Sequence, residues 1–156
     1  DIPEPYNTLE ENATEKSTTI HRLTNQNCFS EDTGLEVEAL NGEPGVKSTR
    51  YAGDIRNLQA NIDKLLLNLQ GKENRNAQFR TVISLILGNT EYLFEGICKG
   101  KIIEDQKGLQ GFGYDPVFVP DESKKTFAEM SMEEKNMFSH RRKATDKLMA
   151  FLKLSE

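Results

Sequence analysis

Cysteine and histidine are scarce in this sequence, which has two of each among its 156 residues. Cys28 and Cys98 show neither C-x-x-C spacing nor a nearby histidine pair, which argues against a zinc centre and against a disulfide framework. We therefore expect both thiols to be reduced in the core of a cytoplasmic protein.

An excess of positive charge is also lacking. The 20 lysines and arginines stand against 25 aspartates and glutamates, giving a net charge of −5 and a pI near 5.2. We expect no duplex nucleic acid or anionic membrane as partner, whereas a small anionic ligand remains possible where basic groups gather locally. No apolar run approaches membrane-spanning length and no charged, then apolar leader follows Asp1, so neither a transmembrane helix nor a signal peptide is predicted.

Several motifs of nucleotide-binding proteins and hydrolases are missing. There is no G-x-x-x-x-G-K-[ST] loop, the G-x-G-x-x-G pattern is interrupted at Pro116, and no EF-hand loop occurs. With two histidines and no nucleophile elbow, a serine or cysteine hydrolase has little support, and His21 is most simply a surface residue. Because repeats, low-complexity tracts and long linkers are absent as well, we expect a single domain over residues 1–156.

Helical and strand patterns are present along the whole chain. Thr8 and Glu11 form a capping box that predicts a helix over about 9–24. The alternation around Leu35 predicts a half-buried strand, with residues 31–34 at a strand-to-strand bend. A second helix is expected from a cap at Asp54, before Gly71 stops it.

The second half of the chain favours a sheet followed by a helix. β-branched and aromatic residues from Ala77 onward predict a meander of antiparallel strands, with turns at Gly88-Asn89 and Gly100-Lys101. A capping box of Ser131 and Glu134 precedes a final helix from about Ser139. The predicted fold class is α/β, with an elongated mixed sheet flanked by helices.

The stretch EDTG places Glu31 and Asp32 beside a glycine that permits a sharp backbone change. Mg²⁺ takes one or two protein carboxylates and completes its shell with water and phosphate oxygens, so the two acids are candidate ligands for a metal shared with a nucleotide. Their alternative role is that of solvated turn residues.

Residues 111–118 read GFGYDPVF. Glycine backbone can approach a planar ligand closely while Phe112 or Tyr114 stacks on it and Asp115 accepts hydrogen bonds. Alternatively, the glycines form a bulge and the rings enter the core. The residues alone leave both interpretations open.

The stretch EEKNMFSHRRKA concentrates positive charge around the start of the final predicted helix, on Lys135, His140, Arg141, Arg142 and Lys143. Ser139 can cap that helix, and its free N–H groups add to the basic side chains as a site for an anion. The alternative is a solvated basic face on an acidic protein.

Three stretches read together resemble one family in order and wording: EDTGLEVEALNGEPGVKSTRYAG, GFGYDPVF and EEKNMFSHRRKA. They are similar to the inosine/xanthosine triphosphate pyrophosphatase family, whose members remove non-canonical purine nucleotides from the nucleotide pool. The resemblance implies an elongated α/β body with an active-site cleft between two lobes, usually assembled as a homodimer. It also implies Mg²⁺-dependent hydrolysis of ITP, dITP or XTP to the monophosphate and pyrophosphate.

The resemblance also assigns roles to individual positions. Asp32 matches the catalytic acid, which binds metal and activates the attacking water, and Glu4 and Glu31 match further acids of the metal site. The substrate contacts implied are Thr33, Phe112, Gly113, Tyr114, Asp115, Lys135, His140 and Arg141, with Lys16 and Arg50 on the phosphate side. Donors at His140 and Arg141 would select a purine with a 6-oxo group, because the 6-amino group of adenine would leave them unpaired.

One part of the family pattern has no match. The family begins with a strand and a turn of the form [ST]-x-N-x-x-K that holds the triphosphate, and no such segment precedes Asp1. We therefore expect a domain that lacks the family's first strand and helix, with weaker phosphate binding and an exposed sheet edge if the protein itself has no such segment.

Other classes of protein fit the same residues. A nucleotide-binding protein would keep the aromatic loop and the basic residues without hydrolysing the ligand. A protein-interaction domain would use both as a docking surface and bind no nucleotide. Among enzymes, a pyrophosphatase for another altered nucleotide is the nearest alternative.

Overall fold

The centre of the molecule is a four-stranded sheet with strand order β1-β2-β3-β4, seen in a computed structural model that describes residues 6–154. β1 (Cys28–Val37), β2 (Asn76–Leu87) and β3 (Thr90–Ile102) are long, and β4 (Phe118–Pro120) pairs only with the end of β3. All three pairings are antiparallel. The α/β class and the meander are confirmed, and the sheet described is antiparallel where a mixed one was expected.

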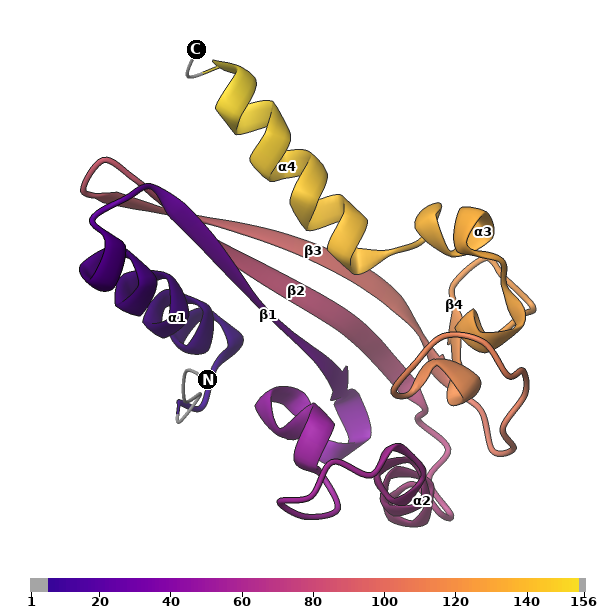
Figure 1. Cartoon of the computed structure of the whole chain (residues 1–156). Helices are drawn as coiled ribbons and strands as arrows, with labels where there is room; N and C mark the ends of the chain where they lie inside the picture. The colour runs from indigo at the N-terminus through magenta and orange to yellow at the C-terminus, as the bar shows by residue number, and fades with distance from the viewer. Residues whose placement is uncertain (1–5, 155–156) are drawn as a thin grey trace.

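Helices α1 (Leu9–Thr24) and α4 (His140–Leu154) cover opposite faces of this sheet (Figure 1). Val82 of β2 packs with Leu9 and Ala13 of α1, whereas the next residue, Ile83, packs with α4. Successive side chains of a strand point to opposite faces, so the alternation of apolar residues in β2 places one helix on each side.

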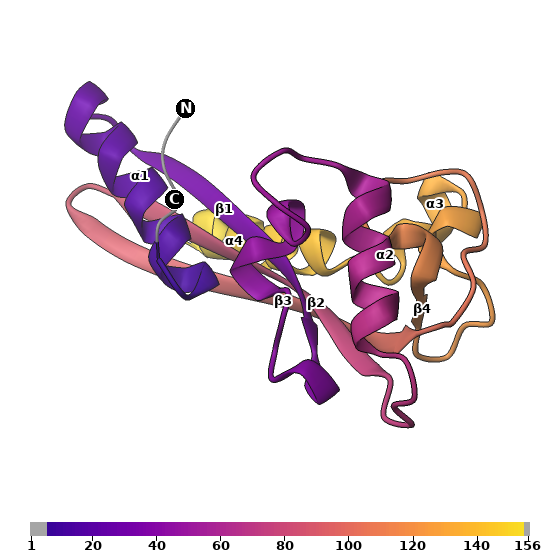
Figure 2. The same ribbon diagram turned by 90° about the horizontal axis from the view of Figure 1, so that it is seen from below.

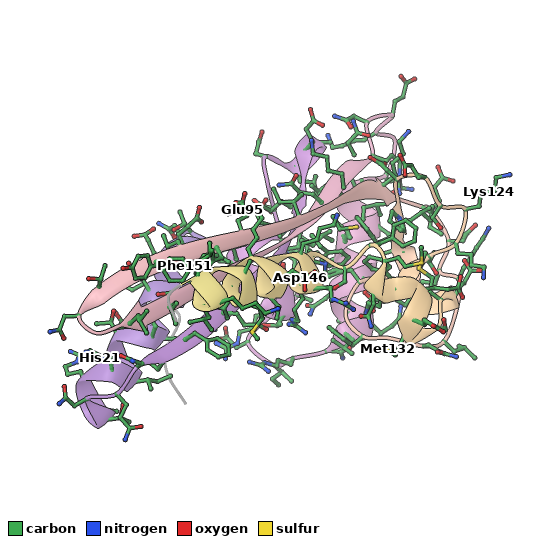
Figure 3. All side chains as sticks on the ribbon, turned by 90° about the horizontal axis from the view of Figure 1, so that it is seen from above. His21, Glu95, Lys124, Met132, Asp146 and Phe151 are labelled. Atoms are coloured by element: carbon green, nitrogen blue, oxygen red, sulfur yellow. The ribbon has the colours of Figure 1, made fainter. Side chains whose placement is uncertain are left out.

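The remaining elements gather at one end of the long strands (Figure 2). They are α2 (Leu58–Asn68), α3 (Met132–Asn136), β4 and the short 3₁₀ helices η1 (Glu38–Leu40), η2 (Gly45–Arg50), η3 (Asp115–Val117) and η4 (Phe127–Glu129). The main core lies here, where the rings of Phe79, Phe118 and Phe127 contact one another. The molecule is elongated, with His21 and Lys124 near its opposite ends (Figure 3).

Two of the three predicted helices begin where the sequence indicates, α1 at Leu9 and α4 at His140. The Thr8 hydroxyl accepts a hydrogen bond from the Glu11 amide at the start of α1. The capping box of Ser131 and Glu134 starts α3, and Ser139 accepts from the Arg142 amide at the start of α4. Local capping chemistry therefore determines these ends.

Three predictions about turns and caps were wrong. Asn57, not Asp54, caps α2, because its side chain accepts from the amide of Ala60 and α2 begins at Leu58. Gly100 and Lys101 lie within β3, where a side chain at Gly100 would collide with the backbone of Val119. Residues 31–34 lie inside β1 and not at a bend.

Both cysteines are free, with Cys98 buried and Cys28 partly exposed. Burial raises the pKa of the Cys98 thiol to about 11, so this group stays protonated near neutrality. None of the helices within residues 6–154 combines the length and apolar character needed to cross a membrane.

Candidate active site

A cavity of about 270 Å³ opens along β1, the edge strand of the described sheet. It lies where α1, η2 and α2 face the loop before η3 and the start of α4. Most of the predicted site residues line it: Lys16, Glu31, Asp32, Thr33, Phe112, Gly113, Tyr114, Asp115, Lys135, His140 and Arg141. Residues from distant parts of the sequence therefore meet in one hollow.

Two predicted residues are not among those lining this cavity. Arg50 is exposed at the end of η2 and lines a neighbouring cavity of about 870 Å³. Arg50 therefore lies outside the β1 cavity, and its contact with the phosphate side of the substrate stays a prediction. Glu4 lies outside the described residues.

The acidic pair of β1 is split between the two faces of the sheet. Asp32 is opposite Val82 and Glu31 is opposite Ile83, so their side chains leave the strand in opposite directions. Lys16 of α1 lies with its Nζ atom 3.7 Å from Asp32 Oδ1 and donates to the Glu31 carbonyl oxygen at 2.7 Å. The two carboxylates therefore line the cavity from opposite faces of β1.

The role of Gly34 differs from the predicted one, which was to permit a sharp backbone change beside the two acids. Its backbone continues the strand, and an added Cβ atom would lie 2.5 Å from the carbonyl oxygen of Gly45. The missing side chain lets η2 pack directly against β1. η2 thereby forms part of the cavity wall, through Ser48 and Thr49.

Thr33 lies on the same face of β1 as Glu31. Its hydroxyl oxygen is 2.8 Å from that of Thr81 on β2, directly across the strand pair. The cross-strand hydrogen bond holds the Thr33 hydroxyl at the cavity wall.

The loop before η3 is folded around Asp115. One carboxylate oxygen of Asp115 accepts from the Phe112 amide at 3.0 Å and from Lys135 Nζ at 2.6 Å. The Phe112 ring is 61% exposed, and Lys135 Nζ lies 4.4 Å from its centre. Gly111 has a φ of 80°, and a side chain there would collide with Asp115. The loop therefore presents the Phe112 ring to the cavity.

Tyr114 and Phe118 behave differently from Phe112. Both are buried, and the Tyr114 hydroxyl donates to the Ser48 carbonyl oxygen at 2.6 Å. Burial raises the pKa of Tyr114, so the phenol remains a hydrogen-bond donor. Of the two interpretations of GFGYDPVF, the ligand loop describes Phe112, and packing in the core describes Tyr114 and Phe118.

His140 forms the deep part of the cavity wall at the start of α4. Its ring is buried and stacks on Phe79, with ring centres 4.8 Å apart and planes 16° apart. Burial, helped by the charges of Arg141, Lys135 and Lys143, lowers the pKa of His140 to about 3. His140 is therefore neutral near pH 7, and its buried Nδ1 atom has no hydrogen-bond partner within residues 6–154.

The basic stretch around α4 divides into two groups. Lys135, His140 and Arg141 line the cavity, and Arg141 Nε donates to Glu31 Oε1 at 2.9 Å. Arg142 pairs instead with Asp146, and Lys143 donates to the Ile97 carbonyl oxygen. The first group fits the anion-site interpretation, and the second fits the solvated-face interpretation.

Sequence reasoning missed one wall of the cavity. This wall consists of η2, the start of α2 and the residue before its cap, and its members are Val46, Ser48, Thr49, Arg56, Leu58 and Asn61. Val46, Ser48 and Thr49 lie within the first family-like stretch but were given no role, and the other three residues lie outside all three stretches. Only the position of Arg56 next to a helix cap, Asn57, gave a local signal for an anion site.

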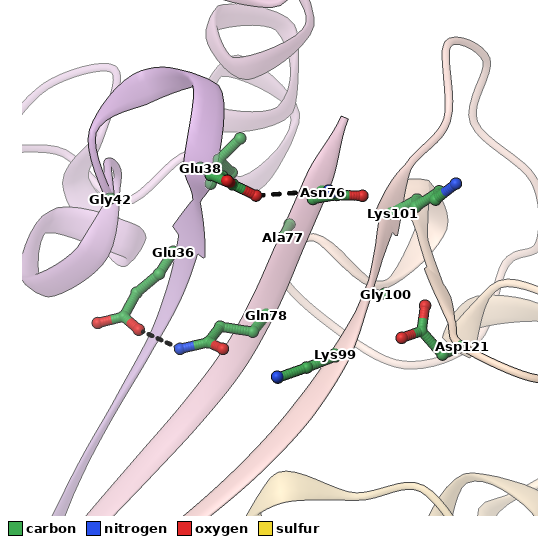
Figure 4. Close-up of a pocket in the computed structure, with 11 residues that line it drawn as sticks. Glu36, Glu38, Gly42, Asn76, Ala77, Gln78, Lys99, Gly100, Lys101 and Asp121 are labelled. Atoms are coloured by element: carbon green, nitrogen blue, oxygen red, sulfur yellow. Dashed lines mark hydrogen bonds between the residues drawn. The ribbon is translucent and has the colours of Figure 1, made fainter. Parts of the chain in front are cut away.

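A larger hollow of about 550 Å³ lies across the ends of β1, β2 and β3 (Figure 4). Its polar residues are mostly satisfied by one another, since Gln78 donates to Glu36 and Asn76 donates to Glu38. It contains none of the predicted site residues. We therefore assign the chemistry to the cavity of β1, despite its smaller volume.

The donor atoms of the β1 cavity suit a hard cation better than a soft one. Asp32 and Glu31 offer carboxylate oxygens, and neither cysteine lines the cavity. Residues 6–154 contain no group of three or more His, Cys, Asp or Glu side chains arranged to hold a metal ion. A metal bound here would have to share its shell with other oxygen ligands.

The fold is that of an α/β protein, and its β1 cavity brings together carboxylates, basic side chains and the exposed Phe112 ring. The model of the Ham1 family matches residues 1–151, and this chain belongs to that family. A "dITP/XTP pyrophosphatase" of Flavobacterium psychrophilum is 54% identical over 153 residues, which cover 98% of this chain and 80% of the relative. The namesake from Flavobacterium johnsoniae is 50% identical over 152 residues, 97% of this chain and 79% of the relative.

Solved structures show the same relationship. The Staphylococcus aureus Ham1 protein superposes with a TM-score of 0.96 at 43% identity, covering 100% of this chain and 82% of that one. A HAM1 protein from Coxiella burnetii gives a TM-score of 0.94 at 35% identity, covering 98% and 80%. The resemblance inferred from the three sequence stretches is confirmed.

Proposed function

We propose that this protein hydrolyses the non-canonical purine nucleotides ITP, dITP and XTP to the nucleoside monophosphate and pyrophosphate. One observation carries the proposal. Asp32, the exposed Phe112 ring and the neutral His140 beside Arg141 line the same cavity. The names of relatives at 54% and 50% identity support it.

The base-binding end is formed by Phe112, His140 and Arg141. The Phe112 ring offers a stacking surface for a purine, and Lys135 Nζ lies over the ring at 4.4 Å from its centre. A neutral imidazole has one N–H donor, and Arg141 adds guanidinium donors, so a 6-oxo group has partners to accept from. Adenine would present a 6-amino group to these donors and leave them unpaired, which disfavours its binding.

The reacting end is formed by Asp32 and Lys16. Asp32 is buried on β1, and its carboxylate is positioned to orient a water molecule and take its proton during attack on the α-phosphorus. Lys16 lies beside Asp32 and supplies positive charge for the phosphate oxygens.

Mg²⁺ is the cofactor that we propose. Asp32 would be its main protein ligand, with Glu31 and Glu4 as the further candidates, and bound Mg²⁺ would neutralise the charge of the triphosphate. Glu31 is held by Arg141 and leaves β1 on the face opposite to Asp32, so we give it the smaller part. We further propose that the chain is a single domain of a cytoplasmic protein, and that it acts as a homodimer, as the family resemblance implies.

The test is pyrophosphate release from ITP, dITP, XTP, GTP, ATP and UTP, measured with Mg²⁺ and with a chelator. We expect metal-dependent release that favours ITP, dITP and XTP. Asp32→Asn should lower kcat by about 10²–10⁴-fold, as expected for loss of a general base. The control Asp146→Asn, on the exposed side of α4, should leave kcat unchanged.

Two outcomes would contradict the proposal. Binding of ITP without pyrophosphate release would indicate a nucleotide-binding protein. No binding of any nucleotide would favour a protein-interaction domain.

A further inference from the structure

The charged groups of the β1 cavity are almost completely paired with one another. Its three acids are Asp32, Asp115 and Glu31 and its four cations are Lys16, Lys135, Arg141 and Arg56. Three ion pairs form, Lys16–Asp32 at 3.7 Å, Lys135–Asp115 at 2.6 Å and Arg141–Glu31 at 2.9 Å. Arg56, the fourth cation, makes no ion pair or hydrogen bond within residues 6–154.

Arg56 occupies a position that favours an anion for a second reason. It directly precedes Asn57, the N-cap of α2, and Leu58 of the first turn also lines the cavity. The N-terminus of a helix carries partial positive charge and unpaired N–H groups, which attract anions. An anion beside Arg56 would therefore meet a side-chain cation and the positive end of an 11-residue helix.

The neighbouring Asn61 is not a competing ligand. Its side-chain oxygen accepts from the Ala52 amide at 2.8 Å, and its nitrogen donates to the Thr49 carbonyl oxygen at 3.0 Å. These bonds fasten α2 to η2. Asn61 therefore holds the start of α2, which Arg56 precedes, in place at the cavity.

Arg56 also lines a second cavity, of about 870 Å³. The two cavities share Val46, Thr49 and Arg56. The second is lined by four cations, Lys47, Arg50, Arg56 and Lys64, and two acids, Glu43 and Asp54. The positive charge thus continues into a cavity that none of the residues assigned to the base lines.

We propose that Arg56 binds the β- and γ-phosphates of the nucleoside triphosphate. The assignment rests on the proposed function, because it takes Phe112, His140 and Arg141 as the base-binding end. In this scheme the polyphosphate runs from the α-phosphorus near Asp32, past Arg56, toward the second cavity. Arg56 is a substrate-binding residue in this scheme and takes no part in proton transfer.

The test is equilibrium binding of two probes in the presence of Mg²⁺. One is the α,β-imido analogue of ITP, which is not cleaved between the α- and β-phosphates, and the other is inosine monophosphate. Arg56→Gln should weaken binding of the analogue by about tenfold or more, the usual effect of losing a hydrogen bond to a charged group. Binding of the monophosphate should not change, since it lacks the β- and γ-phosphates.

Arg22→Gln is the matched control, because it removes the same charge from an exposed position at the end of α1. It should bind both probes like the unmodified protein. Arg56→Lys should recover part of the affinity for the analogue. Arg56 and Arg22 are both exposed, and Arg56 makes no ion pair or hydrogen bond within residues 6–154, so all three variants should fold normally.

The results separate the two proposals. Unchanged analogue binding by Arg56→Gln, or an equal loss for both probes, would overturn the assignment of Arg56. If the unmodified protein binds the analogue but does not hydrolyse ITP, the proposed hydrolysis fails and the Arg56 assignment is still decided by the binding data. If it binds neither probe, both proposals fail.

Discussion

At the scale of single residues, His140 is the group whose surroundings change its chemistry most. Burial against Phe79 and the nearby charges of Arg141, Lys135 and Lys143 lower its pKa to about 3. In the unfolded chain its pKa would be about 6.5. Below pH 6.5 the unfolded state therefore takes up a proton that the folded state does not, and the folded state loses stability as pH falls.

We predict that this one residue lowers the free energy of unfolding by about 2 kcal/mol between pH 7 and pH 5. Urea denaturation at both pH values would measure it. The glutamine of His140→Gln does not titrate in this range. The variant should therefore lose less free energy of unfolding between the two pH values, by about that amount. Equal losses in both proteins would show that His140 takes up a proton in the folded state as readily as in the unfolded chain.

At the scale of elements, the position of α4 depends on Gly96 of β3. A Cβ atom at Gly96 would collide with the His140 carbonyl oxygen and lie 2.5 Å from the Ala144 amide nitrogen. Both obstacles are backbone atoms, which cannot rotate away as a flexible side chain does. The glycine therefore sets how closely the first turn of α4, with His140 and Arg141, approaches the sheet.

We predict that Gly96→Ala lowers the free energy of unfolding by about 1–3 kcal/mol, the usual cost of overpacking. It should also raise KM for ITP, because the base-binding residues move away from the sheet with α4. Lys101→Ala, an exposed position on the same strand, serves as the control. Wild-type stability and KM in Gly96→Ala would mean that α4 adjusts without displacing the site.

The same scale shows why some elements were predictable and others were not. Helix ends with a Thr8 or Ser131 cap depend on neighbouring residues, and the sequence displays both partners. Gly34 and Gly100 are different. Each makes room for the backbone of a residue that is not its neighbour in the sequence, Gly45 beside Gly34 and Val119 beside Gly100. A sequence shows the glycine but not the neighbour that requires it.

At the scale of the whole molecule, the site is assembled from α1, β1, η2, α2, the loop before η3, α3 and the start of α4. No local pattern could bring these segments together, and the three family-like stretches supplied the residues on β1, the loop and α4. The wall containing Arg56 lay outside those assignments. It became visible only when the fold placed α2 against the same cavity.

The same arrangement explains how an acidic protein can bind an anion. The net charge is −5, yet the β1 cavity contains one more cation than acid, and the adjoining cavity has four cations to two acids. Positive charge is thus gathered where the triphosphate is proposed to lie.

The central claim is that the β1 cavity directs water to the α-phosphorus of a 6-oxo purine triphosphate. Hydrolysis of ITP in water labelled with ¹⁸O, with both products examined by mass spectrometry, tests it most directly. The account predicts one ¹⁸O atom in the inosine monophosphate and none in the pyrophosphate. Label in pyrophosphate or in inorganic phosphate, or no products at all, would contradict it.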